Sequence, residues 1–320
     1  MGAMQLTVIG AGSVGLAVAA SFAQAGCQVS LMARPGALDR LRARPITVAG
    51  MLGEHRIDAG ALRVEDATRP PPACIDCDML VVTTKAYDVA DAVRPYADAT
   101  RSIAPRAVLL MQNGLGSAEA ARGVLGPHIP IYSTAMLIGM QRVGDTHIKV
   151  TAHSSPVWCG ALLGDDEAAL ASLIDAASGG FLPMVRQPDI EQTILSKLLF
   201  NTCMNPTGAL TGLCYGDLLE NAHSRALITE LASETLQVFA ATSGFRPFAS
   251  GQDYVENRLM PVVIPHSAPH RSSMLQDLEA GRRTEIDFLN GAIVRMGASA
   301  GIATPNHRCL VSLIHAREPA

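Results

Sequence analysis

Short runs of apolar residues alternate with helical patterns in the first part of the chain. Residues 5–9, 78–84 and 107–111 are nearly continuous apolar runs. Such runs are typical of strands that are buried on both faces of a parallel sheet. An Ala-rich helical pattern at residues 16–25 connects the first run to another at residues 28–33. This order of strand, helix and strand predicts an α/β sheet with helices on its faces.

Shorter patterns fill the remainder of the region before residue 186. Two short runs, 46–48 and 55–58, flank the glycine-containing stretch 50–53, which predicts a β-hairpin. The other elements predicted in this region are helices at 38–43, 88–96, 117–124 and 166–177 and strands at 131–138, 146–152, 157–160 and 181–185.

Helical periodicity dominates from residue 186 onward. Pro188 and Asp189 can open a long helix over residues 190–204. The helices predicted after it lie at residues 215–219, 224–243, 251–260, 273–280 and 288–299. The pattern therefore predicts two domains, an α/β domain over residues 1–185 and an all-α domain over residues 186–320.

A glycine-rich turn follows the first predicted strand. Gly10-Ala-Gly12-Ser-Val-Gly15 has G-x-G-x-x-G spacing between a strand and a helix. Gly10 suits a tight turn, Gly12 lets the backbone approach a pyrophosphate, and Gly15 lets the helix pack closely on the strand. Backbone N–H groups at the helix start, at Ser13 and Val14, then face the phosphates. Such turns are common alone, but this context predicts a Rossmann-type N-terminal domain.

The residue after the second strand indicates which dinucleotide binds. A site for NAD usually has Asp or Glu there, which accepts hydrogen bonds from the ribose 2′-hydroxyl. This chain has Arg34 instead. A guanidinium can grip a 2′-phosphate through two hydrogen bonds, which favours NADP. The alternative is an ordinary solvated arginine at a strand end.

Composition and charge exclude several classes of partner. Lys plus Arg number 25 and Asp plus Glu number 29, so the net charge of −4 attracts neither nucleic acid nor anionic lipid. Aromatic residues make up only 4% of the chain, and no apolar stretch reaches membrane-spanning length. The first strand begins too early for a signal peptide. We therefore expect a cytoplasmic protein with no nucleic-acid or membrane partner.

The cysteines indicate a reducing compartment. Seven are scattered along the chain, which does not suit a disulfide framework. Cys74 and Cys77 have C-x-x-C spacing, but no second pair or histidine cluster completes a zinc site. We expect buried thiols and no metal.

A polar stripe interrupts the long helix at residues 190–204 and just beyond it. Lys197, Asn201 and Asn205 are spaced one turn apart on one face. Asparagine is a poor choice for a helix interior, and apolar residues surround the stripe. This favours a helix that lines a cleft, and the alternative is a stripe exposed to solvent.

Taken in order, several motifs resemble those of the 2-dehydropantoate 2-reductase (ketopantoate reductase) family. The resemblance spans about residues 4–315. The motifs are Gly10–Gly15, Val-Thr-Thr-Lys85-Ala, Gln112-Asn113-Gly114, Lys197-Leu-Leu-Phe-Asn201-Thr-Cys-Met-Asn205-Pro206, Ser272-Ser-Met-Leu-Gln-Asp277 and Glu285-Ile-Asp-Phe-Leu-Asn-Gly291.

The resemblance implies NADPH-dependent reduction of 2-dehydropantoate to pantoate in pantothenate biosynthesis. Lys197 matches the family's general acid, and Glu285 matches the active-site glutamate beside that lysine. The implied substrate contacts come from Asn113, Asn201, Asn205 and Ser273. The implied cofactor contacts come from Gly10, Gly12, Ser13, Val14, Gly15, Arg34, Lys85, Asn113 and Glu285.

Two positions depart from the family pattern. Members often have Asn where this chain has Tyr215, and they have Asn shortly before the Ser-Ser-Met motif, where this chain has His270 and Arg271. His270 could contact the substrate carboxylate as a cation or could be a plain loop residue. A reductase of a different 2-oxo acid and a non-catalytic NADP-binding redox sensor therefore stay open as alternatives. The sequence also leaves the oligomeric state, including a homodimer, undecided.

Overall fold

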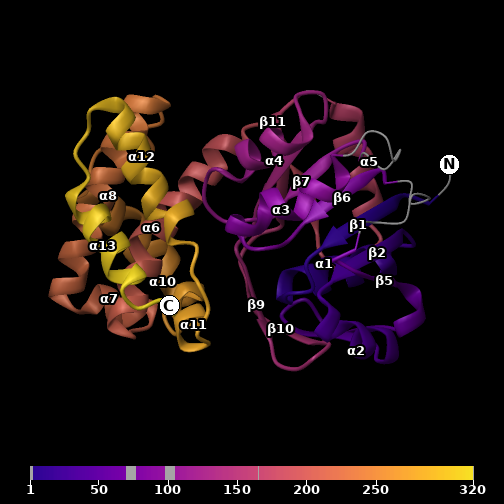
Figure 1. Ribbon diagram of the computed structural model, residues 1–320. Coiled ribbons are helices and arrows are strands. Elements are labelled where there is room, and N and C mark those ends of the chain that lie inside the picture. Colours follow the sequence, from indigo (N-terminus) through magenta and orange to yellow (C-terminus); the bar gives the residue numbers. More distant parts are fainter. Residues whose placement is uncertain (1–2, 70–76, 98–104, 165, 320) are drawn as a thin grey trace. The chain divides into compact units, whose positions relative to one another are not determined.

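Within the residues that the computed structural model describes (3–69, 77–97, 105–164 and 166–319), eight strands form one sheet in the order β12-β11-β8-β7-β6-β1-β2-β5 (Figure 1). Neighbouring strands are parallel except β8 and β11. The strands are β1 (Gln5–Ile9), β2 (Gln28–Ala33), β5 (Arg63–Asp66), β6 (Met79–Val82), β7 (Val108–Leu110), β8 (Ile131–Ala135), β11 (Val157–Leu163) and β12 (Met184–Arg186). The predicted apolar runs β1, β6 and β7 are neighbours, which confirms the α/β sheet.

Contacts within the chain divide it into two units. The first comprises residues 1–112 and 117–191, and the second comprises residues 113–116 and 192–320. The helices of the first unit are α1 (Ser13–Gln24), α2 (Leu38–Ala43), α3 (Val89–Val93), α4 (Ser117–Leu125) and α5 (Glu167–Ala177). Cys74, half of the C-x-x-C pair, lies outside the described residues.

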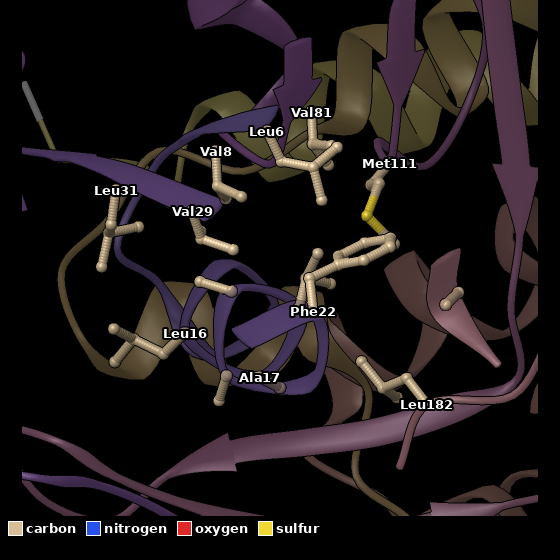
Figure 2. Close-up of a cluster of buried hydrophobic side chains, with 14 of the residues drawn as sticks. Leu6, Val8, Leu16, Ala17, Phe22, Val29, Leu31, Val81, Met111 and Leu182 are labelled. Carbon is tan, nitrogen blue, oxygen red and sulfur yellow. The ribbon is translucent and has the colours of Figure 1, made fainter. Parts of the chain in front are cut away.

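Helix α1 packs tightly on the central strands. Val8 of β1 pairs in register with Leu31 of β2 and Val81 of β6, and all three are fully buried. Figure 2 shows Leu16 and Phe22 of α1 among these side chains, in one apolar cluster. Truncating a ring such as that of Phe22 in this setting typically costs about 3–5 kcal/mol. The glycine turn between β1 and α1 is therefore anchored on both sides by the core.

A smaller sheet in the first unit has the order β4-β3-β10-β9 in the described residues. Its strands are β3 (Ile46–Gly50), β4 (His55–Ile57), β9 (Ile138–Arg142) and β10 (His147–His153). The antiparallel pair β3 and β4 confirms the predicted hairpin. The single strand predicted at 131–138 is wrong, because the chain leaves the large sheet after β8 and enters this one at β9. The prediction also missed β5, which has only four residues at the sheet edge.

The second unit consists of helices, as predicted (Figure 1). They are α6 (Ile190–Thr211), α7 (Tyr215–Glu220), α8 (Ala222–Thr242), α9 (Gly251–Tyr254), α10 (Ile264–Ser267), α11 (Ser273–Glu279), α12 (Asn290–Ala300) and α13 (Pro305–His315), with a π-helix at Val255–Val263 between α9 and α10. The sequence prediction missed α13, although Pro305 at its first position is a typical start signal. The helix predicted at 251–260 is present but changes type, because α9 ends at Tyr254 and the π-helix begins at Val255.

Helix α6 is longer than predicted, because it continues through Pro206 to Thr211. Proline has no N–H group, so the Thr202 carbonyl loses its usual partner four residues ahead. The side-chain amide of Asn290 donates a hydrogen bond to this carbonyl at 2.9 Å. The same amide donates to Nδ1 of the buried His307 at 3.0 Å. A side chain from α12 thus replaces the missing backbone donor and lets α6 carry its polar stripe without a break.

No helix in the described parts of the chain is both long and apolar enough to span a membrane.

Candidate active site

The turn between β1 and α1 has the geometry that its glycines predict. Gly10 has a φ of +107°, which L side chains rarely adopt. A Cβ atom on Gly15 would lie 1.9 Å from the Gly10 carbonyl oxygen and 2.5 Å from Thr83 Oγ1. That hydroxyl donates to the carbonyls of Ile9 and Gly10 at 2.9 and 3.0 Å. Thr83, for which no role was predicted, therefore fixes the turn by hydrogen bonds from the residue that follows β6.

The space beside Gly12 is open. A Cβ atom there would meet nothing within 4 Å. Gly12 is the N-cap of α1, and the first turn of this helix carries no acidic side chain. Its backbone N–H groups and helix dipole favour an anion at this end. Arg142, another residue that sequence reasoning missed, donates to the Ala11 carbonyl at 3.2 Å and adds positive charge. These residues fit the phosphates of a dinucleotide.

Two further cofactor candidates follow β2 and β6, the two strands that flank β1 in the large sheet. Arg34 comes directly after β2, and Lys85 comes shortly after β6, at the start of a 3₁₀ turn. The Arg34 side chain is 85% exposed and forms an ion pair with Asp88 at 3.3 Å. A 2′-phosphate at Arg34 would therefore have to compete with Asp88 for the guanidinium.

The second unit brings Lys197 and Glu285 together electrostatically. Lys197 lies on α6, and Glu285 is the residue that caps a 3₁₀ turn at Ile286–Phe288. Burial lowers the pKa of Lys197 to about 8, although the Glu285 carboxylate acts in the opposite direction. A lysine with such a pKa is charged at neutral pH but gives up its proton more readily than an exposed one. This is the property of a proton donor.

The two asparagines of the α6 stripe are buried. Asn201 and Asn205 are 7% and 4% exposed, so the alternative of a stripe facing solvent does not hold for them. Asn205 Oδ1 accepts a hydrogen bond from the Tyr215 hydroxyl at 2.8 Å. Its backbone carbonyl accepts one from Ser272 Oγ at 3.2 Å. Asn205 is therefore held by α7 on one side and by the start of α11 on the other.

The remaining predicted substrate residues also belong to the second unit. Ser273 is the first residue of α11 and is exposed, while its neighbour Ser272 caps the helix by accepting from Leu275 N–H at 3.1 Å. Asn113 lies in the segment 113–116, whose Leu115 N–H donates to the Phe288 carbonyl at 2.9 Å. This contact holds the Asn113 segment against Phe288, which lies three residues after Glu285 in the sequence.

The two departures from the family pattern lie against each other. The rings of Tyr215 and His270 have centroids 5.1 Å apart, and Tyr215 N–H donates to the His270 carbonyl at 3.0 Å. Burial lowers the pKa of His270, so the neutral form prevails at pH 7. This disfavours the idea of a cationic contact from His270. Tyr215 is instead the residue of the two that touches the polar stripe.

The structure therefore divides the predicted residues between the units. The first unit carries Gly10, Gly12, Ser13, Val14, Gly15, Arg34 and Lys85, and the second carries Asn113, Lys197, Asn201, Asn205, Ser273 and Glu285. The residues for which no individual role was predicted are mostly supports: Thr83, Ser272, Asn290 and His307. The sequence contains a signal for only one of them. Pro206 inside a helical pattern implies a carbonyl that needs another donor, and Asn290 supplies it.

Comparisons with known proteins agree with these observations. The family model “Ketopantoate reductase PanE/ApbA” matches residues 6–164, and “Ketopantoate reductase PanE/ApbA C terminal” matches residues 189–318. The 2-dehydropantoate 2-reductase of Aquifex aeolicus is 28% identical over 320 residues, which cover 98% of this chain and 97% of that protein. The enzyme of the same name from Archaeoglobus fulgidus is 29% identical over 324 residues, which cover 99% of each chain.

Solved structures share the fold. A PanE/ApbA family ketopantoate reductase from Ralstonia eutropha has a TM-score of 0.79 at 24% identity, and the match covers 98% of both chains. A D-mandelate dehydrogenase in complex with NADH and anilino(oxo)acetate has a TM-score of 0.83 at 23% identity, again over 98% of both chains. These likenesses confirm the predicted α/β domain followed by a helical domain.

Proposed function

Because the chain belongs to the ketopantoate reductase PanE/ApbA family of oxidoreductases, we propose that it reduces 2-dehydropantoate to pantoate with NADPH, in pantothenate and coenzyme A biosynthesis. When bound, the nicotinamide cofactor supplies the hydride for the 2-oxo group. The backbone of Gly10–Gly15 binds its phosphates, and Arg34 binds its 2′-phosphate. Lys85, Asn113 and Glu285 complete the cofactor contacts.

The proton comes from the second unit. As the 2-oxo group is reduced, its oxygen gains negative charge, and Lys197 Nζ donates a proton to it. Glu285 keeps Lys197 in the ammonium form by opposing the effect of burial on its pKa. The amides of Asn201 and Asn205 and the Ser273 hydroxyl orient the substrate through its carboxylate and hydroxyl groups.

The observation that carries this proposal is the state of Lys197. Lys197 is only partly exposed, and withdrawing a lysine from water is costly, so a purely structural α6 would have an apolar residue there. Here the pKa is lowered to about 8 beside a carboxylate on a different element. A strongly shifted group with a specific charged partner is a typical mark of a functional site. A redox sensor that never transfers a proton has no need for a lysine with a lowered pKa beside a carboxylate.

The test is oxidation of NADPH by the purified protein, followed at the cofactor's absorbance, with 2-dehydropantoate as substrate. We expect turnover that a Lys197→Ala variant loses while NADPH still binds. Lys149→Ala is the matched control, because Lys149 is an exposed lysine on β10. Turnover that survives in Lys197→Ala would remove the lysine as the acid. Binding of NADPH without any turnover would favour the redox sensor.

One observation favours a second candidate, a reductase of a 2-oxo acid that lacks the 4-hydroxyl group of 2-dehydropantoate. The Tyr215 hydroxyl already donates to Asn205 Oδ1 at 2.8 Å. The Asn205 amide is thereby oriented to offer its Nδ2 donor, which suits a carboxylate or carbonyl oxygen better than a substrate hydroxyl. The rings of Phe200 and His270 flank Tyr215 and add apolar surface.

Comparing two substrates decides between these candidates. We would measure kcat/KM for 2-dehydropantoate and for the same acid without its 4-hydroxyl, in the parent protein and in Tyr215→Phe. A higher kcat/KM for the hydroxyl-free acid, reduced or reversed in Tyr215→Phe, supports the second candidate. Tyr254→Phe is the control, since Tyr254 is another buried tyrosine of the same unit. A clear preference for 2-dehydropantoate in the parent excludes it.

A further inference from the structure

The short segment that carries Glu285 is held by side chains from the end of α13 and just beyond it. Glu318 Oε1 accepts two hydrogen bonds from Thr284, one from its N–H at 2.7 Å and one from its hydroxyl at 2.6 Å. The Thr284 oxygen in turn accepts from Ile286 N–H at 3.2 Å. Thr284 is 2% exposed, so these bonds are shielded from water. The backbone is thus fixed on both sides of Glu285.

A histidine completes this arrangement from the other side. His315 Nδ1 lies 2.9 Å from Glu318 Oε2, and its Nε2 lies 3.0 Å from Asp287 Oδ1. Arg283 donates to the other oxygen of Asp287 at 3.2 Å. The hydrogen bond to Glu318, followed by the contacts with Asp287, raises the pKa of His315. The His315 ring bridges the carboxylates of Asp287 and Glu318, both of which follow Glu285 in the chain.

Arg317, which lies between His315 and Glu318 in the sequence, contacts the helix that carries Lys197. Arg317 Nη1 donates to the Ala209 carbonyl at 2.6 Å, in the last turn of α6. A cation at this end of a helix satisfies an orphan carbonyl and complements the helix dipole. His315, Arg317 and Glu318, which we term the C-terminal clamp, therefore bind both elements of the acid pair.

We infer that the C-terminal clamp is a positioning device that sets Glu285 against Lys197, and that Glu318 is its principal residue. The inference rests on the proposed roles of Lys197 and Glu285. None of the three clamp residues needs to touch substrate or cofactor. Glu318 acts through Thr284 on the backbone of Glu285, and its carboxylate is largely buried, at 9% exposure.

A clamp of this kind has a signature that simple stabilisation lacks. Glu285 raises the pKa of Lys197, so a displaced Glu285 lets that pKa fall. The high-pH limb of kcat reports the ionisation of the acid in the substrate complex. Loosening the clamp should therefore move this limb to lower pH, whereas a loss of stability alone lowers the amount of active protein and leaves the limb in place.

The experiment compares Glu318→Ala with Glu318→Gln in the full chain. Glutamine keeps an oxygen that can accept both bonds from Thr284, so it should restore most of the function. Glu285→Gln and Lys197→Ala are measured beside them as reporters of the acid pair. Glu220→Ala is the matched control, because Glu220 is an exposed carboxylate at the end of α7. Thr284→Val, which removes the hydroxyl but keeps the backbone N–H that donates to Glu318, replaces Glu318→Ala if that variant does not fold.

We expect Glu318→Ala to lower kcat about tenfold and to shift its high-pH limb in the same direction as Glu285→Gln. Glu318→Gln should lie close to the parent. An unmoved limb in Glu318→Ala, with a shifted limb in Glu285→Gln, overturns the clamp and leaves the proposed function intact. If neither Glu285→Gln nor Lys197→Ala affects kcat, the acid pair is wrong and the clamp falls with it.

Discussion

The glycine turn of the first unit is built from consecutive residues, whereas the acid pair of the second unit is built from residues far apart in the chain. In the turn, φ at Gly10 and the missing Cβ of Gly15 decide the geometry, and Thr83 Oγ1 adds one clasp. Around the acid pair, backbone shape decides little. Lys197 lies on α6, and Glu285 lies in a short segment that is held in place by hydrogen bonds from Thr284 to the Glu318 carboxylate.

This difference predicts how each region fails. A backbone site depends on a few atoms that cannot be moved, so one wrong Cβ destroys it and most other changes leave it alone. A site made of side chains depends on a network of supports, and each support contributes a smaller, separable share. Mutations can therefore test whether function in the first unit is lost all at once and function in the second unit in steps.

Lys197→Met should have the largest effect and should separate catalysis from stability. We expect kcat to fall by about 10²–10⁴-fold, since the proposed proton donor is lost, with NADPH affinity unchanged. The same variant should be more stable at pH 7 by about 3 kcal/mol, because the folded state binds the lysine proton less tightly than the unfolded chain does.

The pH dependence of this gain follows from the sign of the shift. The pKa of Lys197 is lowered from 10.5 to about 8, so the charge of Lys197 lowers the free energy of unfolding by its full amount below pH 8. This effect fades as pH rises from 8 towards 10.5. Urea unfolding at pH 7 and at pH 10 should therefore show a smaller advantage for Lys197→Met at the higher pH. In the parent protein, kcat should decline as pH rises through about 8.

Gly15→Ala and Gly12→Ala should break the glycine turn in different ways. A Cβ on Gly15 would lie 1.9 Å from a backbone oxygen, so we expect a loss of about 3 kcal/mol in unfolding free energy and no cofactor binding. A Cβ on Gly12 meets nothing within 4 Å, so folding should be unaffected. NADPH binding should still weaken, because the proposed pyrophosphate site needs that space. Thermal unfolding with and without NADPH measures both effects, and normal binding by Gly12→Ala would contradict the proposed phosphate site.

The contrast between the units also explains which features could be predicted from the sequence. The glycine turn was predictable because its chemistry follows from local spacing and from the strand and helix around it. The spacing of Lys197, Asn201 and Asn205 was sufficient to place them on one helix face. Glu285 was found only through resemblance to a family, since nothing in its local pattern distinguishes it from a carboxylate at a helix start.

The supports could not be predicted, because they are chosen by tertiary packing. The helix predicted over residues 190–204 continues through Pro206 to Thr211, and Asn290 supplies the missing donor from another helix. The bond from Tyr215 to Asn205 likewise joins two helices. Hydrophobic periodicity carries no information about such pairs, and β5 and α13 show that even whole elements escape notice when their patterns are short or weak.

Arg34→Gln should lower the preference for NADPH over NADH by about 10–100-fold, since a hydrogen bond to a charged group contributes about 1.5–3 kcal/mol. The ratio of kcat/KM for the two cofactors measures this. Asp88→Asn is the informative partner variant. It releases Arg34 from the ion pair at 3.3 Å and should raise the preference for NADPH. An unchanged ratio in both variants would place the 2′-phosphate elsewhere and would mean that this residue, unlike the glycines, is a solvated side chain.

The smallest effect should come from the support of α6, and it has a specific rescue. Asn290→Leu leaves the Thr202 carbonyl without a donor, which should cost about 1–2 kcal/mol of unfolding free energy. Pro206→Ala restores a backbone N–H at the position that normally donates to this carbonyl. By itself Pro206→Ala should change little, because Asn290 already satisfies the carbonyl.

In the double variant, the new N–H should recover the part of the Asn290→Leu loss that comes from Thr202. The part due to His307, whose Nδ1 also accepts from Asn290, should remain. A double-mutant cycle by urea unfolding should therefore give a coupling of about 1 kcal/mol between residues 206 and 290, and kcat should recover in parallel, because α6 carries Lys197. Additive losses of unfolding free energy would mean that Asn290 stabilises only α12 and His307. The polar stripe on α6 would then need no support from another helix, as the glycine turn needs little.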